Sequence, residues 1–129
     1  MQRDRKGATM GPLLIVEPHV DTAELVVELL RSVGFESRTY ADADAIDGAL
    51  DDPRPGLLLV SLGPRDQRAV GDLIVEANAR AIPVVVMSTA DREWPGADAV
   101  LTKPFAIEVL VQTVRSLCCP PSSSNDPRL

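Results

Sequence analysis

Short apolar runs alternate with amphipathic stretches along this chain. The central run, Leu57 to Leu62, is apolar except for Ser61 and is bounded by Pro55-Gly56 and Gly63-Pro64. Continuous apolar character is typical of a strand that is buried on both faces of a parallel sheet. Three similar runs predict further buried strands, and a mixed segment predicts an edge strand: Leu13–Val16, Ile82–Met87, Ala99–Thr102 and Phe35–Tyr40.

Apolar residues at helical spacing predict four helices between these strands. Asp21 with Glu24 is the pattern of a capping box at the start of the first helix, and Gly34 follows its end. A weaker helix starts at Asp42, a third covers about Gln67 to Arg80, and Pro104 opens the last. The predicted inward faces are Leu25, Leu29, Leu30 and Val33; Ile46, Ala49 and Leu50; Val70, Leu73, Ile74 and Ala77; and Ile107, Leu110, Val111, Val114 and Leu117.

The alternation of strands and helices predicts an α/β domain with a parallel sheet and helices on both faces. The last connection between strands is unusually short. Only ten residues, Thr89 to Asp98, separate two predicted strands, whereas a crossover with its helix needs about 10–12 residues or more. Trp94-Pro95-Gly96 breaks this segment further. We therefore predict a fourth helix that is shortened or missing, with at most one turn around Asp91 to Trp94.

Length and charge narrow the class of protein. The chain has 129 residues and a net charge of −6, which fits one domain and disfavours nucleic acid or an anionic membrane as partner. It shows no secretory signal or membrane span, and its two cysteines are adjacent, so we expect a cytoplasmic protein. The expected organisation is a flexible lead over 1–11, a domain over 12–118 and a disordered tail over 119–129.

Polar residues follow the ends of the predicted strands. They are Glu17 with His19, Ser61, Ser88 with Thr89, and Lys103. Ligand and reaction sites of open α/β sheets lie at the carboxyl ends of the strands, so these side chains are expected to converge there.

At this point the chain, from about Leu13 to Leu117, resembles the receiver domain of bacterial two-component response regulators. The segments that carry the resemblance are Leu13–Glu17, Gly56–Leu62, Pro83–Ser88 and Gly96–Phe105, the last with its Leu-Thr-Lys-Pro-Phe ending. The resemblance implies a CheY-like, flavodoxin-like sheet with strand order 2-1-3-4-5. It also implies that an acidic pair holds Mg²⁺, an aspartate accepts a phosphoryl group, a hydroxyl and a lysine bind that group, and an aromatic residue reports the change.

Mapped onto this chain, three of those implied positions have lost their chemistry. The acidic pair is Glu17 and Pro18, the acceptor position is Ser61, and the aromatic switch position is Val100. What remains is the carboxylate of Glu17, the hydroxyl at Ser88 and the ammonium at Lys103. Because Mg²⁺ prefers several oxygens, Glu17 alone makes a weak metal ligand, and Mg²⁺ binding should be weak or absent.

We therefore expect an atypical receiver with no catalytic residue and no cofactor. It would act in two-component signal transduction by binding an unidentified protein, without aspartyl phosphorylation. A Lys103–Glu17 ion pair would replace the metal, and the Lys103–Pro104 peptide bond, cis in the family, would be cis here too. A homodimer is a further expectation.

Alternatives remain open from the sequence. A flavodoxin-like module could bind a nucleotide or small ligand at the same strand ends. A hydrolase could use Ser61 with His19 as base, although the Gly-x-Ser-x-Gly elbow is absent. Ser61 could also accept a phosphoryl group from a Ser/Thr kinase. Trp94 either contacts a partner or folds back to cover the shortened rim.

Overall fold

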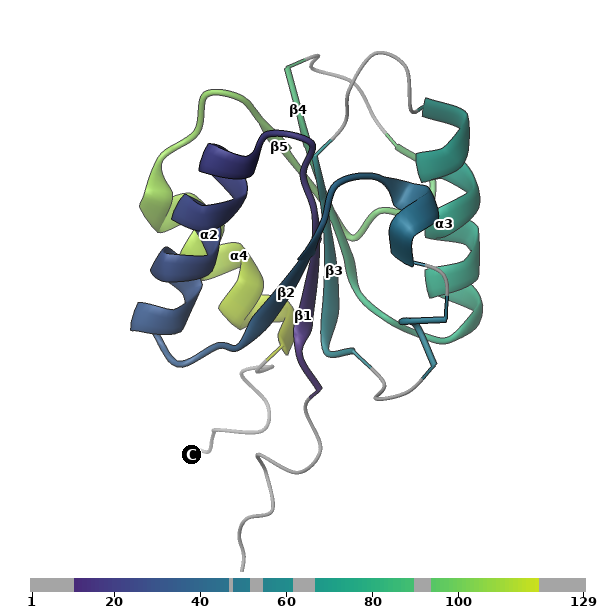
Figure 1. Ribbon diagram of the computed structural model, residues 1–129, viewed down its shortest axis with the longest axis horizontal. Coiled ribbons are helices and arrows are strands. Elements are labelled where there is room, and N and C mark those ends of the chain that lie inside the picture. The colour runs from purple at the N-terminus through teal and green to yellow at the C-terminus, as the bar shows by residue number, and fades with distance from the viewer. Residues whose placement is uncertain (1–10, 47, 52–54, 62–66, 90–93, 119–129) are drawn as a thin grey trace, which may run out of the picture.

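Five parallel strands form the centre of the protein, here a computed structural model that describes residues 11–46, 48–51, 55–61, 67–89 and 94–118. The strands are β1 (Leu13–Val16), β2 (Ser37–Tyr40), β3 (Leu57–Ser61), β4 (Val84–Ser88) and β5 (Ala99–Thr102). Their order in the sheet is β2-β1-β3-β4-β5, which confirms the predicted fold class (Figure 1). β2 lies at one edge, as its mixed composition indicated.

The central strand β3 shows why its sequence is apolar throughout. Leu57 and Leu59 point into one core, and Leu58 and Val60 point into the other. All four side chains are buried. A strand covered on both faces has no position for a solvated side chain, so it loses the alternation that a half-exposed strand shows.

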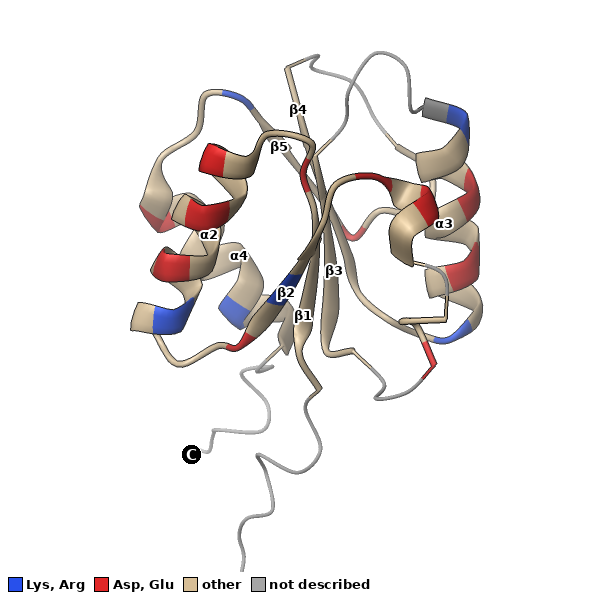
Figure 2. Cartoon of the chain, in the orientation of Figure 1, with Lys and Arg blue, Asp and Glu red and all other residues tan. Residues whose placement is uncertain are grey.

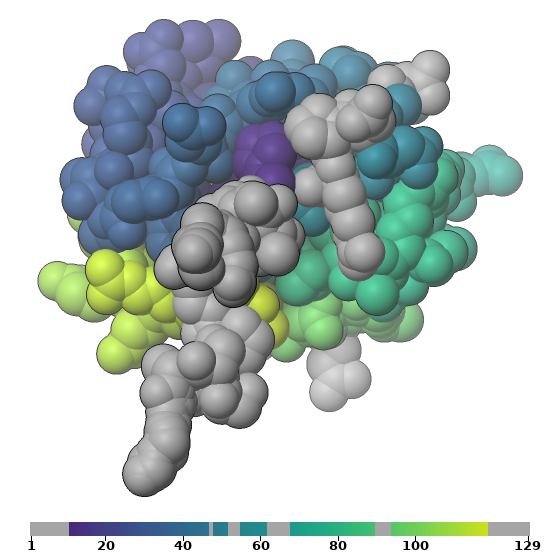
Figure 3. Space-filling view, turned by 90° about the horizontal axis from the view of Figure 1, so that it is seen from below, coloured from purple at the N-terminus to yellow at the C-terminus, as the bar shows by residue number. Residues whose placement is uncertain are grey.

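Helices cover both faces of the sheet. Helices α2 (Val20–Ser32) and α4 (Ile107–Cys118) lie side by side on one face, whereas α3 (Gln67–Ala79) and the 3-10 helix η1 (Ala43–Ile46) lie on the other (Figures 1 and 3). The predicted inward face of α3 is confirmed, since its four residues are all buried: Val70, Leu73, Ile74 and Ala77. The two cores are therefore separated by the sheet.

The start of α2 differs from the prediction. The helix begins at Val20 with His19 at its N-cap position and no side-chain cap, so the Asp21–Glu24 capping box is wrong. Asp21 lies in the first turn instead, where a carboxylate favours the helix dipole. The predicted end is confirmed, because Gly34 has φ of 98° and Phe35 N–H donates to Leu30 carbonyl at 2.9 Å.

Two residues predicted to face inward are exposed. Leu25 on α2 and Ile107 on α4 are 63% and 52% exposed. The face of α2 that packs on the sheet is made by Ala23, Val26 and Leu30, and that of α4 is narrow as well, with Leu110 and Val114. The apolar stripe of each helix is thus wider than the surface that the sheet can cover.

The helix predicted from Asp42 is also wrong. In its described part this segment forms only η1, and Asp42 Oδ1, just before it, accepts the N–H of Ala45 at 2.9 Å. Gly48 then takes φ of 83°, a left-handed conformation that ends a helix. Ile46 and Leu50 are nevertheless buried, so the apolar pattern correctly indicated core residues although no α-helix forms from them.

The connection from β4 to β5 contains no helix among its described residues, 89 and 94–98. The predicted turn at Asp91 to Trp94 falls largely outside the described residues, and Trp94 itself is not helical. Gly96, at φ of 90°, packs closely on α3, where its carbonyl accepts from Asn78 Nδ2 at 3.1 Å. Asp98 closes the loop by accepting the N–H of Val84 at 2.8 Å.

Of the predicted lead 1–11 and tail 119–129, only Gly11 is within the described residues. No helix in the described part of the chain has the length and apolar character needed to cross a membrane.

Replacing Gly96 by Ala should destabilise the fold. A Cβ at this position would lie 2.7 Å from Asn78 Nδ2 and 2.8 Å from Ile74 Cγ2, and Ala disfavours the positive φ. We expect a loss of roughly 2 kcal/mol or more in the free energy of unfolding, measured in urea. Gly71→Ala is the matched control, since its Cβ would meet nothing within 4 Å inside α3. That variant should gain up to about 1 kcal/mol, and equal losses in both variants would contradict the packing described here.

A second prediction concerns the ion pair between Asp51, which lies after η1, and Arg80, which directly follows α3. Arg80 Nε donates to Asp51 Oδ1 at 2.7 Å, and this hydrogen bond lowers the pKa of Asp51. Because the pKa of Asp51 is lower in the folded state, its ionised form stabilises the fold at pH values above the unfolded-state pKa, which is near 3.9 for Asp. This stabilisation is lost as the pH falls through the folded-state pKa. Asp51→Asn should therefore be less stable than wild type at pH 7, and the difference should shrink below about pH 4.

Denaturation midpoints between pH 3 and pH 7 measure this effect. Arg80→Met removes the same pair and should show the same trend with pH. If the difference in stability between wild type and Asp51→Asn stays constant from pH 3 to pH 7, the ion pair is not its cause.

Candidate functional site

The parallel register brings the predicted site residues together at one edge of the sheet. We call Glu17, Pro18, Ser61, Ser88 and Lys103 the rim. Val16 aligns with Val60, Ser61 with Met87, and Ser88 with Thr102, so β1, β3, β4 and β5 end at nearly the same level. Glu17 and Lys103 each follow a strand directly, whereas Ser61 and Ser88 are the last residues of theirs. The prediction that these strand ends converge is confirmed.

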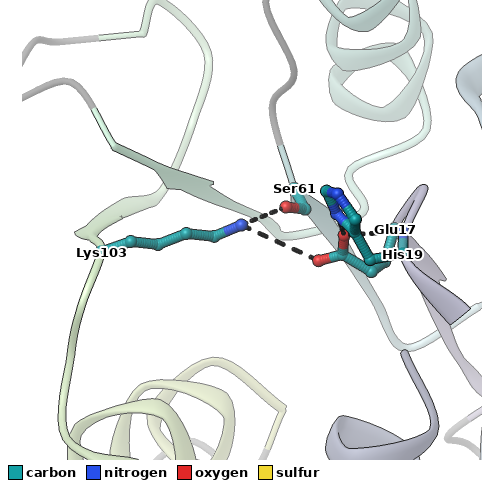
Figure 4. A network of polar contacts seen from close by, with 4 residues as sticks. All are labelled: Glu17, His19, Ser61 and Lys103. Atoms are coloured by element: carbon teal, nitrogen blue, oxygen red, sulfur yellow. Dashed lines mark hydrogen bonds and ion pairs between the residues drawn. The ribbon is translucent and has the colours of Figure 1, made fainter. Parts of the chain in front are cut away.

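The ammonium of Lys103 holds the rim together. Its Nζ donates a hydrogen bond to Ser61 Oγ at 2.6 Å and lies 3.8 Å from Glu17 Oε1 (Figure 4). The predicted Lys103–Glu17 ion pair is therefore present. The hydrogen bond to Ser61 was not predicted, although both residues had been assigned to the site. The Lys103–Pro104 peptide bond is cis, as predicted.

Burial makes this contact strong. The side chain of Glu17 is only 1% exposed, and that of Lys103 is 29% exposed. A carboxylate buried to this degree needs a cation or hydrogen-bond donors, because its lost hydration costs several kcal/mol. Lys103 supplies the positive charge, and the Ser61 hydroxyl accepts a hydrogen bond from its ammonium.

The second oxygen of Glu17 anchors the turn between β1 and α2. Glu17 Oε2 accepts the backbone N–H of His19 at 3.1 Å and lies 3.2 Å from His19 Nδ1. The His19 ring is 79% exposed. Glu17 Oε1, in contrast, is buried and has no hydrogen bond within the described residues. The carboxylate is thus fixed by its backbone contact and aims its other oxygen at Lys103.

This arrangement suits Mg²⁺ poorly. Pro18 is exposed and brings no side-chain oxygen, and the described residues contain no cluster of three or more His, Cys, Asp or Glu. Mg²⁺ requires near-octahedral oxygen ligands. A divalent cation beside Glu17 Oε1 would also face the ammonium of Lys103. The orphaned oxygen therefore fits an ion pair with Lys103 better than a metal.

The other residues that the sequence singled out lie near the rim or behind it. Ser88 is buried, and its carbonyl accepts the N–H of Lys103 at 2.7 Å, which carries Lys103 into place after β5. Val100 and Trp94 are half-buried and pack against the core on the α3 side. Trp94 therefore packs back onto the domain, and its expected roles in covering the rim or contacting a partner stay predictions.

The geometry does not assemble a serine hydrolase. Among the described residues, no hydrogen bond joins His19 to Ser61. His19 contacts Glu17, and Ser61 contacts Lys103. A histidine base must reach the nucleophile's hydroxyl, so the relay considered from the sequence is not formed.

No family model matches the chain. The chain is 30% identical over 115 residues to the phosphate regulon transcriptional regulatory protein PhoB of Klebsiella pneumoniae, covering 81% of this chain and 50% of PhoB. It is 28% identical over 116 residues to the sensory transduction protein RegX3 of Mycobacterium tuberculosis, covering 84% and 51%. The chain spans about half the length of these curated relatives.

A solved structure agrees over almost the whole chain. The signal receiver domain of a signal transduction histidine kinase from Syntrophus aciditrophicus superposes with a TM-score of 0.73 at 25% identity. The match covers 92% of this chain and 98% of that domain. The same fold is thus found as a separate domain of this size.

Replacing Lys103 by Met should test the rim contact. Without the ammonium, Glu17 stays buried without its charge partner, and we expect a loss of roughly 2–4 kcal/mol in the free energy of unfolding, reduced from the fully buried case by the partial exposure of Lys103. The double variant Glu17→Gln/Lys103→Met removes both charges and should recover most of that loss. Arg115→Met, at an exposed cation on α4, is the control and should change stability little. A double variant as unstable as Lys103→Met would argue against the pair.

Proposed function

The chain belongs to the receiver-domain family of response regulators in two-component signal transduction, and on that premise we propose that it is an atypical receiver that binds another protein without being phosphorylated. The proposal has two parts, which are the absence of aspartyl phosphorylation and an output by protein–protein contact. Each part is supported by a different feature of the molecule.

The observation that carries the first part is the contact of Lys103 with Ser61 and Glu17. The family resemblance implies that this lysine binds a phosphoryl group on an aspartate. Here its ammonium is held by a hydroxyl at 2.6 Å and a carboxylate at 3.8 Å within the chain itself. The lysine therefore has internal partners in the unmodified protein. This supports a site that is complete without a phosphoryl group or metal.

The chemistry of residue 61 supports the same conclusion. Aspartyl phosphorylation needs a carboxylate nucleophile, whereas a serine hydroxyl attacks only when a base activates it. The only group that contacts Ser61 Oγ in the described hydrogen bonds is an ammonium, which donates a proton and cannot accept one. Ser61 is also 4% exposed, which disfavours access by a Ser/Thr kinase.

The second part of the proposal, an output by protein–protein contact, depends on the exposed surface of the domain rather than on the rim. In the described hydrogen bonds no base contacts Ser61, so we expect the domain to act by recognition. An exposed face that does not depend on phosphorylation would be available to a partner at all times. The nucleotide-binding alternative is less well supported, because the turn after β1 is Glu17-Pro18-His19 and has no Gly-rich or hydroxyl-rich loop for phosphates.

Incubation with acetyl phosphate and millimolar Mg²⁺, followed by intact mass spectrometry, tests the first part. The mass should stay unchanged, and Trp94 fluorescence should show no saturable response to Mg²⁺. A receiver domain that keeps its acceptor aspartate serves as the positive control. The variant Pro18→Asp/Ser61→Asp, which restores the acidic residues, is expected to gain a phosphoryl group under the same conditions. An added phosphoryl group on the wild-type chain would overturn the proposal.

A further inference from the structure

An apolar groove of about 600 Å³ lies between α2 and α4. Its floor consists of the buried side chains of Val26, Met87 and Leu110. Leu25 on α2 and Ile107 on α4 also line it and remain 63% and 52% exposed. Most of the lining is therefore hydrocarbon. The volume lies within the range of pockets that hold small organic ligands, about 300–1,000 Å³.

A few polar side chains complete the lining of the groove. They are Glu17, Thr22, Glu28 and Lys103. Acidic residues recur along α2 (Figure 2), and of these only Glu28 lines the groove. Two carboxylates and one ammonium leave the lining with an excess of negative charge. An apolar pocket with a small number of polar groups is the usual composition of a small-molecule site.

The ammonium of Lys103 retains a hydrogen-bond donor that a ligand can use. A lysine ammonium carries three N–H donors. In the described part of the chain, the polar partners of Lys103 Nζ are Ser61 Oγ at 2.6 Å and Glu17 Oε1 at 3.8 Å. The third N–H has no partner there, and the side chain is 29% exposed.

The charges around this donor favour a neutral acceptor. Glu17 already balances the charge of Lys103, so a second carboxylate would gain little from the ammonium. It would also approach Glu17 and Glu28, and like charges repel. An alkylammonium ion would meet the ammonium of Lys103 instead. A carbonyl oxygen accepts a hydrogen bond and avoids both repulsions.

We propose that this groove is a binding site for a neutral small molecule with an aliphatic body and a carbonyl group at one end. The aliphatic body would cover Leu25 and Ile107, and the carbonyl oxygen would accept the third N–H of Lys103. The site needs no phosphate-binding loop, so it differs from the nucleotide site considered from the sequence. It goes beyond the proposed function and does not depend on it.

Octanamide is the probe for the test, with octanoate and octylammonium as charged probes of the same chain length. Each is titrated into the full chain and followed by two-dimensional NMR. We expect saturable shifts at the backbone amides of Met87 and Leu110, and binding of either charged probe that is weaker by about tenfold or more. Hexanamide should also bind about tenfold more weakly than octanamide, because each buried methylene strengthens binding by up to about fourfold.

Variants of the apolar lining locate the site. Leu25→Gln and, independently, Ile107→Gln should each weaken octanamide binding by about threefold or more. Val75→Gln is the matched control, because Val75 on α3 is 67% exposed and lies outside the groove. Its affinity for octanamide should stay at the wild-type value. Circular dichroism checks that each variant is folded.

A variant of Lys103 tests the hydrogen bond to the ligand. Lys103→Met removes the donor and leaves Glu17 without its cation, so octanamide should bind about tenfold more weakly and octylammonium more tightly than in wild type. A general loss of stability would weaken both probes. If Lys103→Met does not fold, Leu25→Gln and Ile107→Gln still decide whether the groove is the site.

Several outcomes would overturn the inference. They are shifts that do not saturate, equal affinity for the three octyl probes, and equal effects of Leu25→Gln and Val75→Gln. Octanamide binding that weakens as the protein concentration rises would overturn it as well, because a second copy of the chain would then cover the groove. The acetyl phosphate experiment bears on the proposed function alone, so either proposal can fail without the other.

Discussion

The position of one ammonium group, Lys103 Nζ, decides what the carboxyl edge of this sheet can do. It reaches across the end of β4, from the residue after β5, to Ser61 on β3 and Glu17 after β1. Glu17 is almost fully buried, so the contact is needed for stability whatever else the rim does. Residues placed for binding a charged ligand are here used to neutralise one another.

That neutralisation depends on the residue type at position 61. An aspartate at position 61 would put a second carboxylate beside Glu17, and two close carboxylates are stable only when cations balance them. Serine removes that charge and leaves one carboxylate for one ammonium. The charge balance of the rim is thus reached within the chain, and Pro18 adds no charge to it.

Much of the fold could be predicted from the sequence because each buried strand is a continuous apolar run between turn residues. The Lys103–Glu17 pair could be predicted too, since the strand ends of a parallel sheet meet at one edge. The hydrogen bond to Ser61 was not predicted, because the sequence places both residues at one edge of the sheet but does not fix which polar atoms there come within hydrogen-bond distance. Periodicity also failed at Ile46 and Leu50, which are buried although only a 3-10 helix forms there.

The two faces of the sheet differ in the extent of the helices that cover them. On the α3 side, one crossover is reduced to η1, and the β4–β5 connection is closed by Gly96 against α3 and by Trp94 over the core. On the other side, α2 and α4 are full helices whose apolar stripes exceed what the sheet covers. A stripe that is wider than its packing surface is a cost unless another molecule covers it. Lys103 and Glu17 belong to the rim and also line the space between these two helices, so the ion pair lies next to that exposed apolar surface.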